Sequence, residues 1–182
     1  GMVLTDDAAL ARECRSLRNL CFQPHKRYVH ERLGWNFRMT NLQAALGLAQ
    51  LERLSEFVDR KRRMGTRYTD LMKTIPGVQL PLPRTEYAEN IYWVYGIVLD
   101  ASQAMDAEEV MKRLAVKEIG CRAFFYPMHQ QPVLRRMGLF AGEHYPEAER
   151  LSRQGFYIPS GLALTADQQQ AVAGAIREVL EG

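Results

Sequence analysis

The sequence predicts a small α+β domain preceded by a long helix, and two observations lead to this fold class. After residue 91, short aliphatic and aromatic runs alternate with helical segments, and most connections between them are short. Before that region, residues 42 to 51 contain no charge, and charged residues return from Glu52 onward. A helix that is apolar on every side is buried on every side. We therefore expect one long helix that starts inside a large structure and ends at a surface.

The N-terminal region is predicted to hold one strand and one helix. Residues 1 to 5 are interpreted as a short strand, and Thr5 or Asp6 is expected to cap a helix that runs to about Leu20. A polar loop comes next, from 23 to 31. The long helix then begins at a capping box, in which the Thr40 hydroxyl and the Gln43 side chain three residues later satisfy each other's backbone amides.

The second half of the chain is predicted to form the α+β layer. A proline-rich stretch, 75 to 83, is the best internal boundary. With the long helix and its continuation counted as a separate part, the predicted parts are 1–40, 41–75 and 76–182. Three strands are predicted after it: 91–99, 122–126 and 156–158. In the first of these, Trp93 and Tyr95 are expected on one face of the sheet. The opposite face would carry Tyr92, Val94 and Val98.

Three helices are predicted between and after these strands: 106–117, 146–154 and 165–180. Two of them begin with side chains suited to capping. Asp106 is followed three residues later by Glu109, and Thr165 is followed by Gln168. Such pairs satisfy the first free amides of a helix.

Composition and charge exclude several functional classes. Of the 182 residues, 47% are hydrophobic and 25% are charged, and a net charge of +3 is too mild to indicate a nucleic-acid partner. No apolar run has the length of a membrane span, and residues 1 to 7 lack the features of a signal peptide. The three cysteines form no CxxC pair. We expect a reduced, cytoplasmic protein with no membrane partner.

Two clusters of polar residues have competing interpretations. The basic run 60–63, followed by Arg67, could bind nucleic acid, but Glu56 precedes Arg60 by four residues, as in ordinary helix-surface ion pairs. A solvated helix face is therefore preferred. His25 and His30 lie five residues apart in a loop, whereas zinc sites have tighter spacing. No metal site is predicted.

The stretch "FFYPMHQQP", residues 124 to 132, is more specific. A strand is predicted to end at Tyr126, and His129 lies just beyond it, where a side chain can meet a ligand. The alternative is a histidine that satisfies loop carbonyls. The chain contains no Ser/His/Asp order, no P-loop and no GxGxxG motif, so no self-contained catalytic apparatus is visible.

Three stretches together resemble the DegT/DnrJ/StrS family of aminotransferases: "LGWNFRMTNLQAALGLAQLERL", "FFYPMHQQP" and "IPSGLALT". The resemblance covers essentially the whole chain. It implies the α/β fold type I of the transferases that depend on pyridoxal 5'-phosphate (PLP). The chain would be the α+β small domain of that fold, with the long connecting helix and the tail of the large domain. The perosamine-synthase-like branch is the most similar.

The resemblance also implies an activity, a cofactor and an assembly. Members of this family transfer an amino group, commonly from glutamate, to a keto sugar linked to a nucleotide. The full-length enzyme would use PLP and work as a homodimer, with the nucleotide sugar and the amino donor as its small-molecule partners. Within the family this chemistry serves the biosynthesis of amino sugars and of polysaccharides.

One family element has no counterpart in this sequence. The family lysine that bonds covalently to the cofactor lies in a short motif, and "GMVLTDD" resembles the segment immediately C-terminal to that motif. None of the five lysines stands in a matching context: Lys26, Lys61, Lys73, Lys112 and Lys117. The resemblance therefore implies a C-terminal part of the enzyme that binds no PLP covalently and is inactive alone.

The resemblance assigns cofactor contacts to the stretch 33–46. Asn36 corresponds to an asparagine that reaches into the neighbouring subunit and hydrogen-bonds its cofactor phosphate. An amide that donates to a phosphate makes a charge-assisted bond worth roughly 1.5–3 kcal/mol. Arg38 either adds positive charge near the same phosphate or braces the loop.

Substrate contacts are implied at five further positions. Tyr126 and His129 match the region that faces the nucleotide sugar, and Arg122 stands at the start of the same strand. Tyr28 and His30 precede the Asn36 loop and are expected to line the same cleft. Two alternatives come from other classes: a non-catalytic α+β module that dimerises or senses a ligand, and a nucleic-acid binder that uses the basic helix.

Overall fold

The computed structural model describes residues 1–182. The chain forms two compact units, Gly1–Arg53 and Leu54–Gly182, and each is described by itself. The first unit contains α1 (Ala8–Arg18) and α2 (Asn41–Leu51). The predicted three-part division remains a prediction about the full-length protein. No helix of this chain has both the length and the apolar character that crossing a bilayer requires.

Helix α1 begins one or two residues later than the two predicted caps imply, and no strand precedes it. The carboxylate of Asp7 accepts hydrogen bonds from the amides of Ala9 and Leu10 at 2.7 and 3.2 Å. Asp7 is therefore the cap, rather than Thr5 or Asp6, because its side chain is the one that reaches the free amides of the first turn. The strand predicted at residues 1 to 5 is absent. A strand needs a neighbouring strand for its backbone groups, and this unit provides none.

The capping box that starts α2 is confirmed. The amide of Thr40 donates to the Gln43 side chain at 2.9 Å, and the amide of Gln43 donates to the Thr40 hydroxyl at 3.2 Å. The predicted single long helix is instead two helices, α2 and α3 (Leu54–Met72), separated by two residues. Helix α2 has no buried residue, and Leu42 is 85% exposed. The predicted burial of α2 in a larger structure therefore stays a prediction about the full-length protein.

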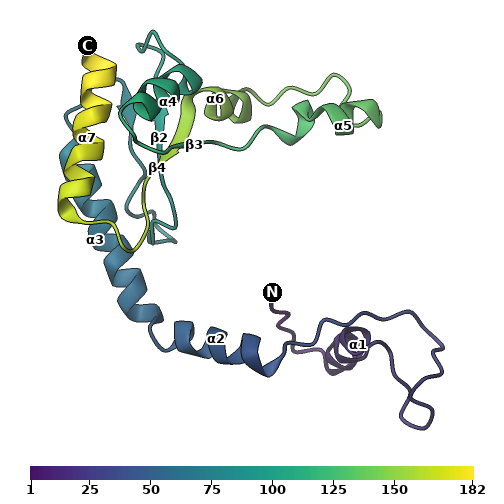
Figure 1. The fold of residues 1–182 in the computed structure, drawn as a ribbon. Helices are drawn as coiled ribbons and strands as arrows, with labels where there is room; N and C mark the ends of the chain where they lie inside the picture. The colour runs from purple at the N-terminus through teal and green to yellow at the C-terminus, as the bar shows by residue number, and fades with distance from the viewer. The chain divides into compact units, whose positions relative to one another are not determined.

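The second unit is built on a four-stranded antiparallel sheet with the order β1-β2-β4-β3 (Figure 1). Its strands are β1 (Val78–Gln79), β2 (Tyr95–Leu99), β3 (Arg122–Ala123) and β4 (Gly155–Ile158). In the register of the two central strands, Tyr95 lies opposite Ile158 and Ile97 lies opposite Phe156. Paired residues share a face of the sheet, so these four side chains form one apolar layer.

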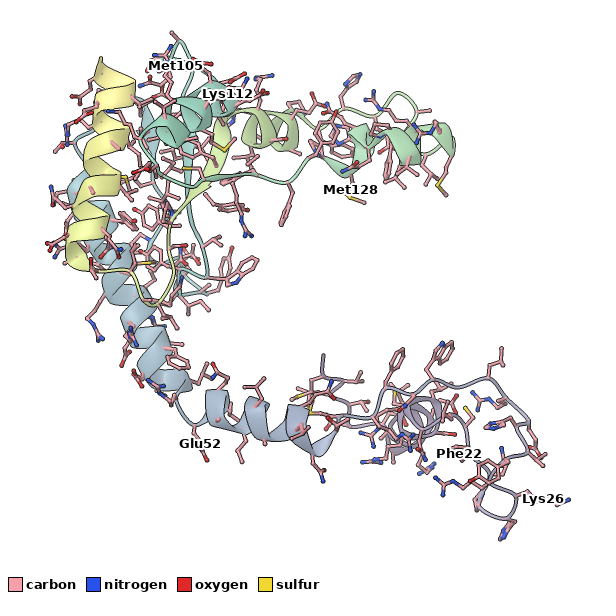
Figure 2. The ribbon with its side chains drawn as sticks, in the orientation of Figure 1. Phe22, Lys26, Glu52, Met105, Lys112 and Met128 are labelled. Carbon is pink, nitrogen blue, oxygen red and sulfur yellow. The ribbon has the colours of Figure 1, made fainter.

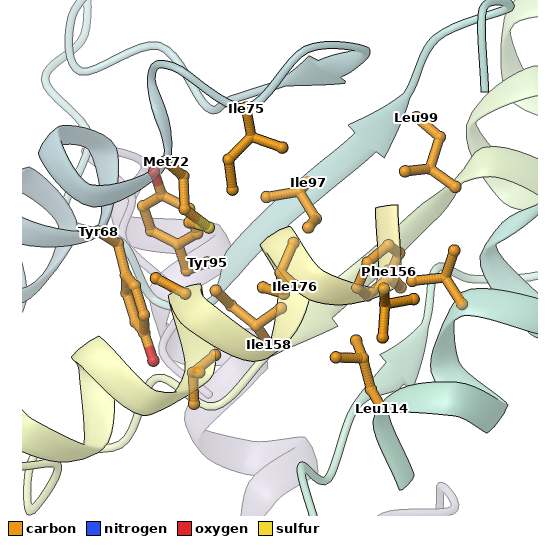
Figure 3. Packing of buried hydrophobic residues seen from close by; sticks show 14 of the residues in the cluster. Tyr68, Met72, Ile75, Tyr95, Ile97, Leu99, Leu114, Phe156, Ile158 and Ile176 are labelled. Carbon is orange, nitrogen blue, oxygen red and sulfur yellow. The ribbon is translucent and has the colours of Figure 1, made fainter. Parts of the chain in front are cut away.

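Helices cover this apolar face and complete the core. They are α3, α4 (Ala107–Val116) and α7 (Ala166–Glu181), and each contributes buried residues to the same cluster. Figure 3 shows Tyr68 and Met72 of α3, Leu114 of α4 and Ile176 of α7 around the strand residues. The predicted helices α4 and α7 are confirmed, each with its predicted cap.

Polar bonds fix the position of the core helices against the rest of the unit. The Tyr68 hydroxyl donates to the Pro159 carbonyl at 2.8 Å, and the hydroxyls of Thr69 and Tyr95 are 2.8 Å apart. These bonds satisfy hydroxyl groups that would otherwise be buried without partners. They also give α3 one defined rotation above the sheet.

Two of the predicted strands are shorter than expected. Strand β2 starts at Tyr95 rather than at residue 91, because Tyr92 has a φ of 50° and leaves the extended conformation. The ring of Tyr92 packs against Gly65, where a Cβ atom would lie 2.4 Å from it. Trp93 is 73% exposed, whereas Tyr95 is fully buried, so the prediction that they share a face is wrong. Strand β3 ends at Ala123 instead of Tyr126.

The remaining elements lie between β3 and β4. A single 3-10 turn, η1 (Met128–Gln130), precedes α5 (Pro132–Arg136), and α6 (Pro146–Gln154) leads into β4. The predicted helix 146–154 and the predicted strand 156–158 are confirmed. The segment that contains η1 and α5 extends away from the sheet (Figure 1).

Candidate functional site

In the first unit, the segment that carries Asn36 is fastened to the end of α1 by backbone hydrogen bonds. The Leu20 amide donates to the Trp35 carbonyl at 3.0 Å, and the Trp35 amide donates to the Leu17 carbonyl at 2.7 Å. The Phe37 amide donates to the Arg18 carbonyl at 3.0 Å. These bonds flank Asn36 on both sides, so its backbone is held although its side chain is exposed.

Gly34 permits the close approach on which this fastening depends. A Cβ atom at residue 34 would lie 2.5 Å from the amide nitrogen of Cys21 and 2.9 Å from its sulfur. Cys21 is buried, has a φ of 50°, and directs its thiol toward the Leu33 carbonyl at 3.5 Å. Sequence reasoning missed this contact. The only signal was the glycine itself, immediately before the Trp-Asn-Phe-Arg stretch.

The side chains of Asn36 and Arg38 form a pair that leaves hydrogen-bond donors free. The Asn36 side-chain oxygen accepts from the Arg38 Nε at 2.9 Å and from the Arg38 amide at 3.4 Å. The Asn36 amide group and the terminal guanidinium nitrogens of Arg38 make no hydrogen bond to the protein. Amide and guanidinium donors suit the oxygens of a phosphate. The donor set therefore fits a phosphate group.

Tyr28 and His30 lie around the ring of Phe22. The Phe22 ring centroid is 6.2 Å from that of Tyr28 and 5.4 Å from that of His30, and the Arg27 guanidinium lies 5.1 Å above it. Figure 2 labels Phe22 and Lys26 in this loop. The His30 Nδ1 is 2.9 Å from the Leu20 carbonyl. His30 therefore anchors the loop, while Tyr28 is exposed to solvent.

In the second unit, Arg122 lies on the sheet face opposite the core. The register pairs Arg122 with Tyr157, whose ring is 4.6 Å from that of Phe124. Phe124 fits there because two of the strand residues beneath its ring are glycines. A Cβ atom at Gly155 would lie 2.3 Å from the Phe124 ring, and one at Gly96 would lie 2.8 Å from it. Sequence reasoning missed this aromatic pair, and the two strand glycines were its signal.

Tyr126 and His129 differ in their accessibility. Tyr126 is exposed just beyond β3, whereas His129 is only 4% exposed. The His129 Nε2 lies 2.8 Å from the Glu149 Oε1, and the ring packs edge-on against Tyr145 at 4.9 Å. The bond from His129 lowers the pKa of the Glu149 carboxyl below its usual value. The alternative in which His129 satisfies loop carbonyls is not what the structure shows, because its ring bonds a carboxylate.

Three of the five cations at 60–63 and 67 on α3 have partners within the unit. One terminal nitrogen of Arg60 donates to the Leu162 carbonyl at 2.6 Å, and the other lies 3.5 Å from Glu56. Lys61 donates to the carbonyls of Trp93 and Ser160, and burial lowers its pKa. Arg62 pairs with Glu89 at 3.0 Å. These three cations hold loops of the second unit together.

Four of the five lysines are committed to partners. Lys61 bonds the carbonyls described above, and the others pair with carboxylates: Lys73 with Asp70, Lys112 with Glu108, and Lys117 with Glu178. Lys26 is exposed in its loop. The unpaired donors of Asn36 and Arg38 fit the phosphate of a cofactor, and the absence of a covalent lysine from this chain stays a prediction. No group of three or more His, Cys, Asp or Glu residues could hold a metal ion.

Comparisons with known proteins match nearly the whole chain. The model of the DegT/DnrJ/EryC1/StrS aminotransferase family matches residues 1–177. The chain is 32% identical to the GDP-perosamine synthase of Escherichia coli O157:H7 over 178 residues, which are 98% of the chain and 46% of that protein. It is also 32% identical to the GDP-perosamine synthase of Caulobacter vibrioides over 181 residues, 99% of the chain and 48% of that protein.

A solved aminotransferase structure has a similar fold over nearly the whole chain. The crystal structure of the aminotransferase TlmJ from Streptoalloteichus hindustanus superposes with a TM-score of 0.83 at 25% identity, covering 97% of this chain and 46% of that chain. The chain thus spans about half the length of the relatives that it matches.

Proposed function

Since this chain belongs to the DegT/DnrJ/EryC1/StrS aminotransferase family, we propose that it is the C-terminal part of a PLP-dependent enzyme acting on a nucleotide-linked sugar. The enzyme would transfer an amino group, commonly from glutamate, to a keto group of that sugar. The names of the two perosamine synthases support a GDP-linked sugar as the first substrate to test. When bound, PLP supplies the electron sink for amino transfer.

The observation that carries the proposal is the pair formed by Asn36 and Arg38. It lies in the sequence stretch that most resembles the family, and it presents unpaired amide and guanidinium donors on a loop held by backbone bonds. An amide and a guanidinium can donate hydrogen bonds that bind and orient a phosphate, but neither group acts as an acid or a base in the reaction. We assign to Asn36 and Arg38 the binding of the cofactor phosphate.

We further propose that the full-length enzyme is a cytoplasmic homodimer in which this loop serves the neighbouring subunit. Helix α2 supports that assembly, because its leucines are exposed in this chain and an apolar helix of this kind is normally covered. The proposed coverage comes from the rest of the large domain and from the dimer partner.

Substrate contacts are proposed at the two places that the resemblance indicates. In the second unit these are Arg122, Tyr126 and His129, and in the first unit Tyr28 and His30. The exposure of Arg122 and Tyr126 supports direct contact with an anionic, polar substrate. His30 is proposed to act mainly by shaping the loop, because its Nδ1 lies within hydrogen-bond distance of the Leu20 carbonyl.

The nucleic-acid alternative has less support. A nucleic-acid interface needs free cations, and Arg60, Lys61 and Arg62 have intramolecular partners. The dimerising or ligand-sensing module remains the second candidate, because the exposed apolar surface of α2 would suit it equally well.

Two experiments test the proposal. The full-length protein, supplied with PLP, glutamate and a GDP-linked 4-keto-6-deoxy sugar, is expected to form an amino sugar that mass spectrometry detects. The 182-residue chain alone is expected to take up no covalent PLP. A chain that retains the cofactor absorbance through desalting, and becomes covalently labelled on borohydride reduction, would contradict the assignment of the covalent lysine to another part of the enzyme.

A further inference from the structure

Residues 130–144, here called the arm, form the part of the second unit that projects away from the sheet between the end of η1 and the start of α6 (Figure 1). Met128, labelled in Figure 2, lies where the chain departs. The residues on either side of the arm, His129 and Tyr145, are neighbours in space, because their rings meet edge-on with centroids 4.9 Å apart. The arm therefore has a defined base.

One carboxylate closes this base. The Glu149 Oε1 lies 2.8 Å from the His129 Nε2 and accepts a hydrogen bond from the Tyr145 amide at 3.3 Å. His144 is also near, with its Nδ1 at 3.9 Å from the same oxygen. The Arg135 Nε, on the arm itself, donates to the His129 carbonyl at 3.1 Å. Glu149 thus ties the outgoing chain to the returning chain.

The same contact determines which nitrogen of His129 carries a proton. A carboxylate can only accept, so the Nε2 must donate to Glu149, and in the neutral ring the lone pair is then on Nδ1. The Nδ1 makes no hydrogen bond to the protein. Only one side-chain nitrogen or oxygen is both fully enclosed and without a partner, and it is the Arg62 Nε. In its neutral form, the buried ring of His129 therefore has one unpaired acceptor, the Nδ1, that is not completely enclosed.

We propose that Glu149 is a positioning residue that holds His129 in the tautomer with the proton on Nε2, so that the Nδ1 accepts a hydrogen bond from a sugar hydroxyl of the substrate. This inference rests on the proposed function for the identity of the substrate. It adds to that function a residue, Glu149, and a specific atom, the Nδ1 of His129. A hydroxyl donor fits an acceptor nitrogen that is held rigidly and has limited access to water.

Variants separate the two functions of this pair. His129→Gln keeps a donor near the position of Nε2 for Glu149 but removes the Nδ1 acceptor. Glu149→Ala removes the carboxylate and leaves the imidazole free to change tautomer. Glu147→Ala is the matched control, since Glu147 is an exposed carboxylate on the same helix that pairs only with Arg150.

The first test uses the 182-residue chain and needs no substrate. Nitrogen-15 NMR of the imidazoles, recorded at a pH where the His129 ring is neutral, is expected to show a protonated Nε2 and an unprotonated Nδ1. Glu149→Ala should convert this signal to a mixture of tautomers, and Glu147→Ala should leave it unchanged. A neutral His129 ring with its proton on Nδ1, or one whose tautomer survives Glu149→Ala, would overturn the assignment of Glu149, whatever reaction the enzyme performs.

The second test uses the full-length enzyme with its nucleotide-linked sugar. His129→Gln and Glu149→Ala should each raise the KM for the sugar by about fivefold to tenfold, as expected for one lost hydrogen bond, with little change in cofactor retention. A normal KM in His129→Gln, combined with the expected NMR result, would reject the hydroxyl contact and keep the tautomer assignment. Absence of amino transfer in the wild-type enzyme would instead reject the proposed function, which separates the two failures.

Discussion

The side chains of Asn36 and Arg38 are joined by a hydrogen bond in which the arginine Nε donates to the asparagine oxygen at 2.9 Å. The bond uses the acceptor of Asn36 and leaves its donor free. It also orients the guanidinium, whose terminal nitrogens remain unbonded. The two interpretations of Arg38 that the sequence left open are therefore compatible, because one nitrogen can brace the loop while the others carry charge to an anion.

Substitutions at Asn36 distinguish a phosphate donor from a simple brace. Asn36→Ala in the full-length enzyme is expected to weaken cofactor retention by about 1.5–3 kcal/mol, the value of one charge-assisted bond. Asn36→Asp keeps the acceptor for Arg38 but places a negative charge toward the phosphate, so it should weaken retention further. Equilibrium dialysis of PLP measures both effects. An aspartate variant that retains PLP normally would show that Asn36 only braces Arg38, and Lys26→Ala in the same loop serves as the control.

Gly34 is predicted to be essential for the shape of the Asn36 loop. In Gly34→Ala the new methyl group would lie 2.5 Å from the backbone of Cys21, and relief of such a clash costs about 1–3 kcal/mol. The amides of Leu20 and Phe37 should then lose protection in hydrogen exchange. Gly47→Ala on α2 is the control, because nothing lies within 4 Å of its Cβ position. That variant should stabilise α2 by up to about 1 kcal/mol.

The exposed leucines of α2 are predicted to drive self-association of the isolated chain. Leu46 is 68% exposed on a helix whose first turns carry no charge, and such a surface is uncommon on a monomer. Sedimentation should therefore show a dimer or larger species, and Leu46→Glu should shift the chain toward monomer. A wild-type chain that sediments as a compact monomer, with Leu46→Glu changing neither its mass nor its melting temperature, would refute this prediction.

The stability of the second unit is predicted to fall at high pH. Burial raises the pKa of Tyr95 to about 12 from an ordinary value of 10.0, and burial raises the pKa of Cys121 to about 11. The folded state thus favours the protonated forms. This contribution is complete below the unfolded pKa and is lost as the pH rises toward the folded pKa. Urea midpoints measured from pH 8 to 12 should decline, most steeply above pH 10.

Tyr95→Phe is the variant that checks this interpretation. It removes one titrating group, so the decline above pH 10 should become shallower, although Cys121 and Tyr68 keep part of it because burial raises the pKa of both. It also removes the hydroxyl contact to Thr69 and so lowers the midpoint at pH 8. A slope identical to that of the wild type would assign the alkaline loss to other groups.

The amino-acid sequence determined the local features of this protein. The caps at Thr40, Asp106 and Thr165 were predicted with their partners, as was the helix 146–154. Each of these features depends on contacts within about four residues, which the sequence displays directly. The family resemblance was also visible from the sequence, because its motifs are short, continuous and in order.

The candidate site was predictable by residue type but not by arrangement. The sequence indicated Asn36, Arg38 and His129 as polar groups at the ends of elements. It did not indicate that His129 would be buried against Glu149, since the two are 20 residues apart and no pattern connects them. The contacts of Asn36 with Arg38 also required the loop geometry that Gly34 permits.

Only the tertiary structure decided which surfaces face the core. The alternation of apolar residues before Tyr95 predicted a longer strand, yet Tyr92 turns to a positive φ so that its ring can fill the space above Gly65, 27 residues away. The apolar sequence of α2 predicted burial, yet α2 has no buried residue. Local sequence sets what each segment can form, whereas burial depends on which distant residues are present to pack against it, and that information does not lie within any single segment.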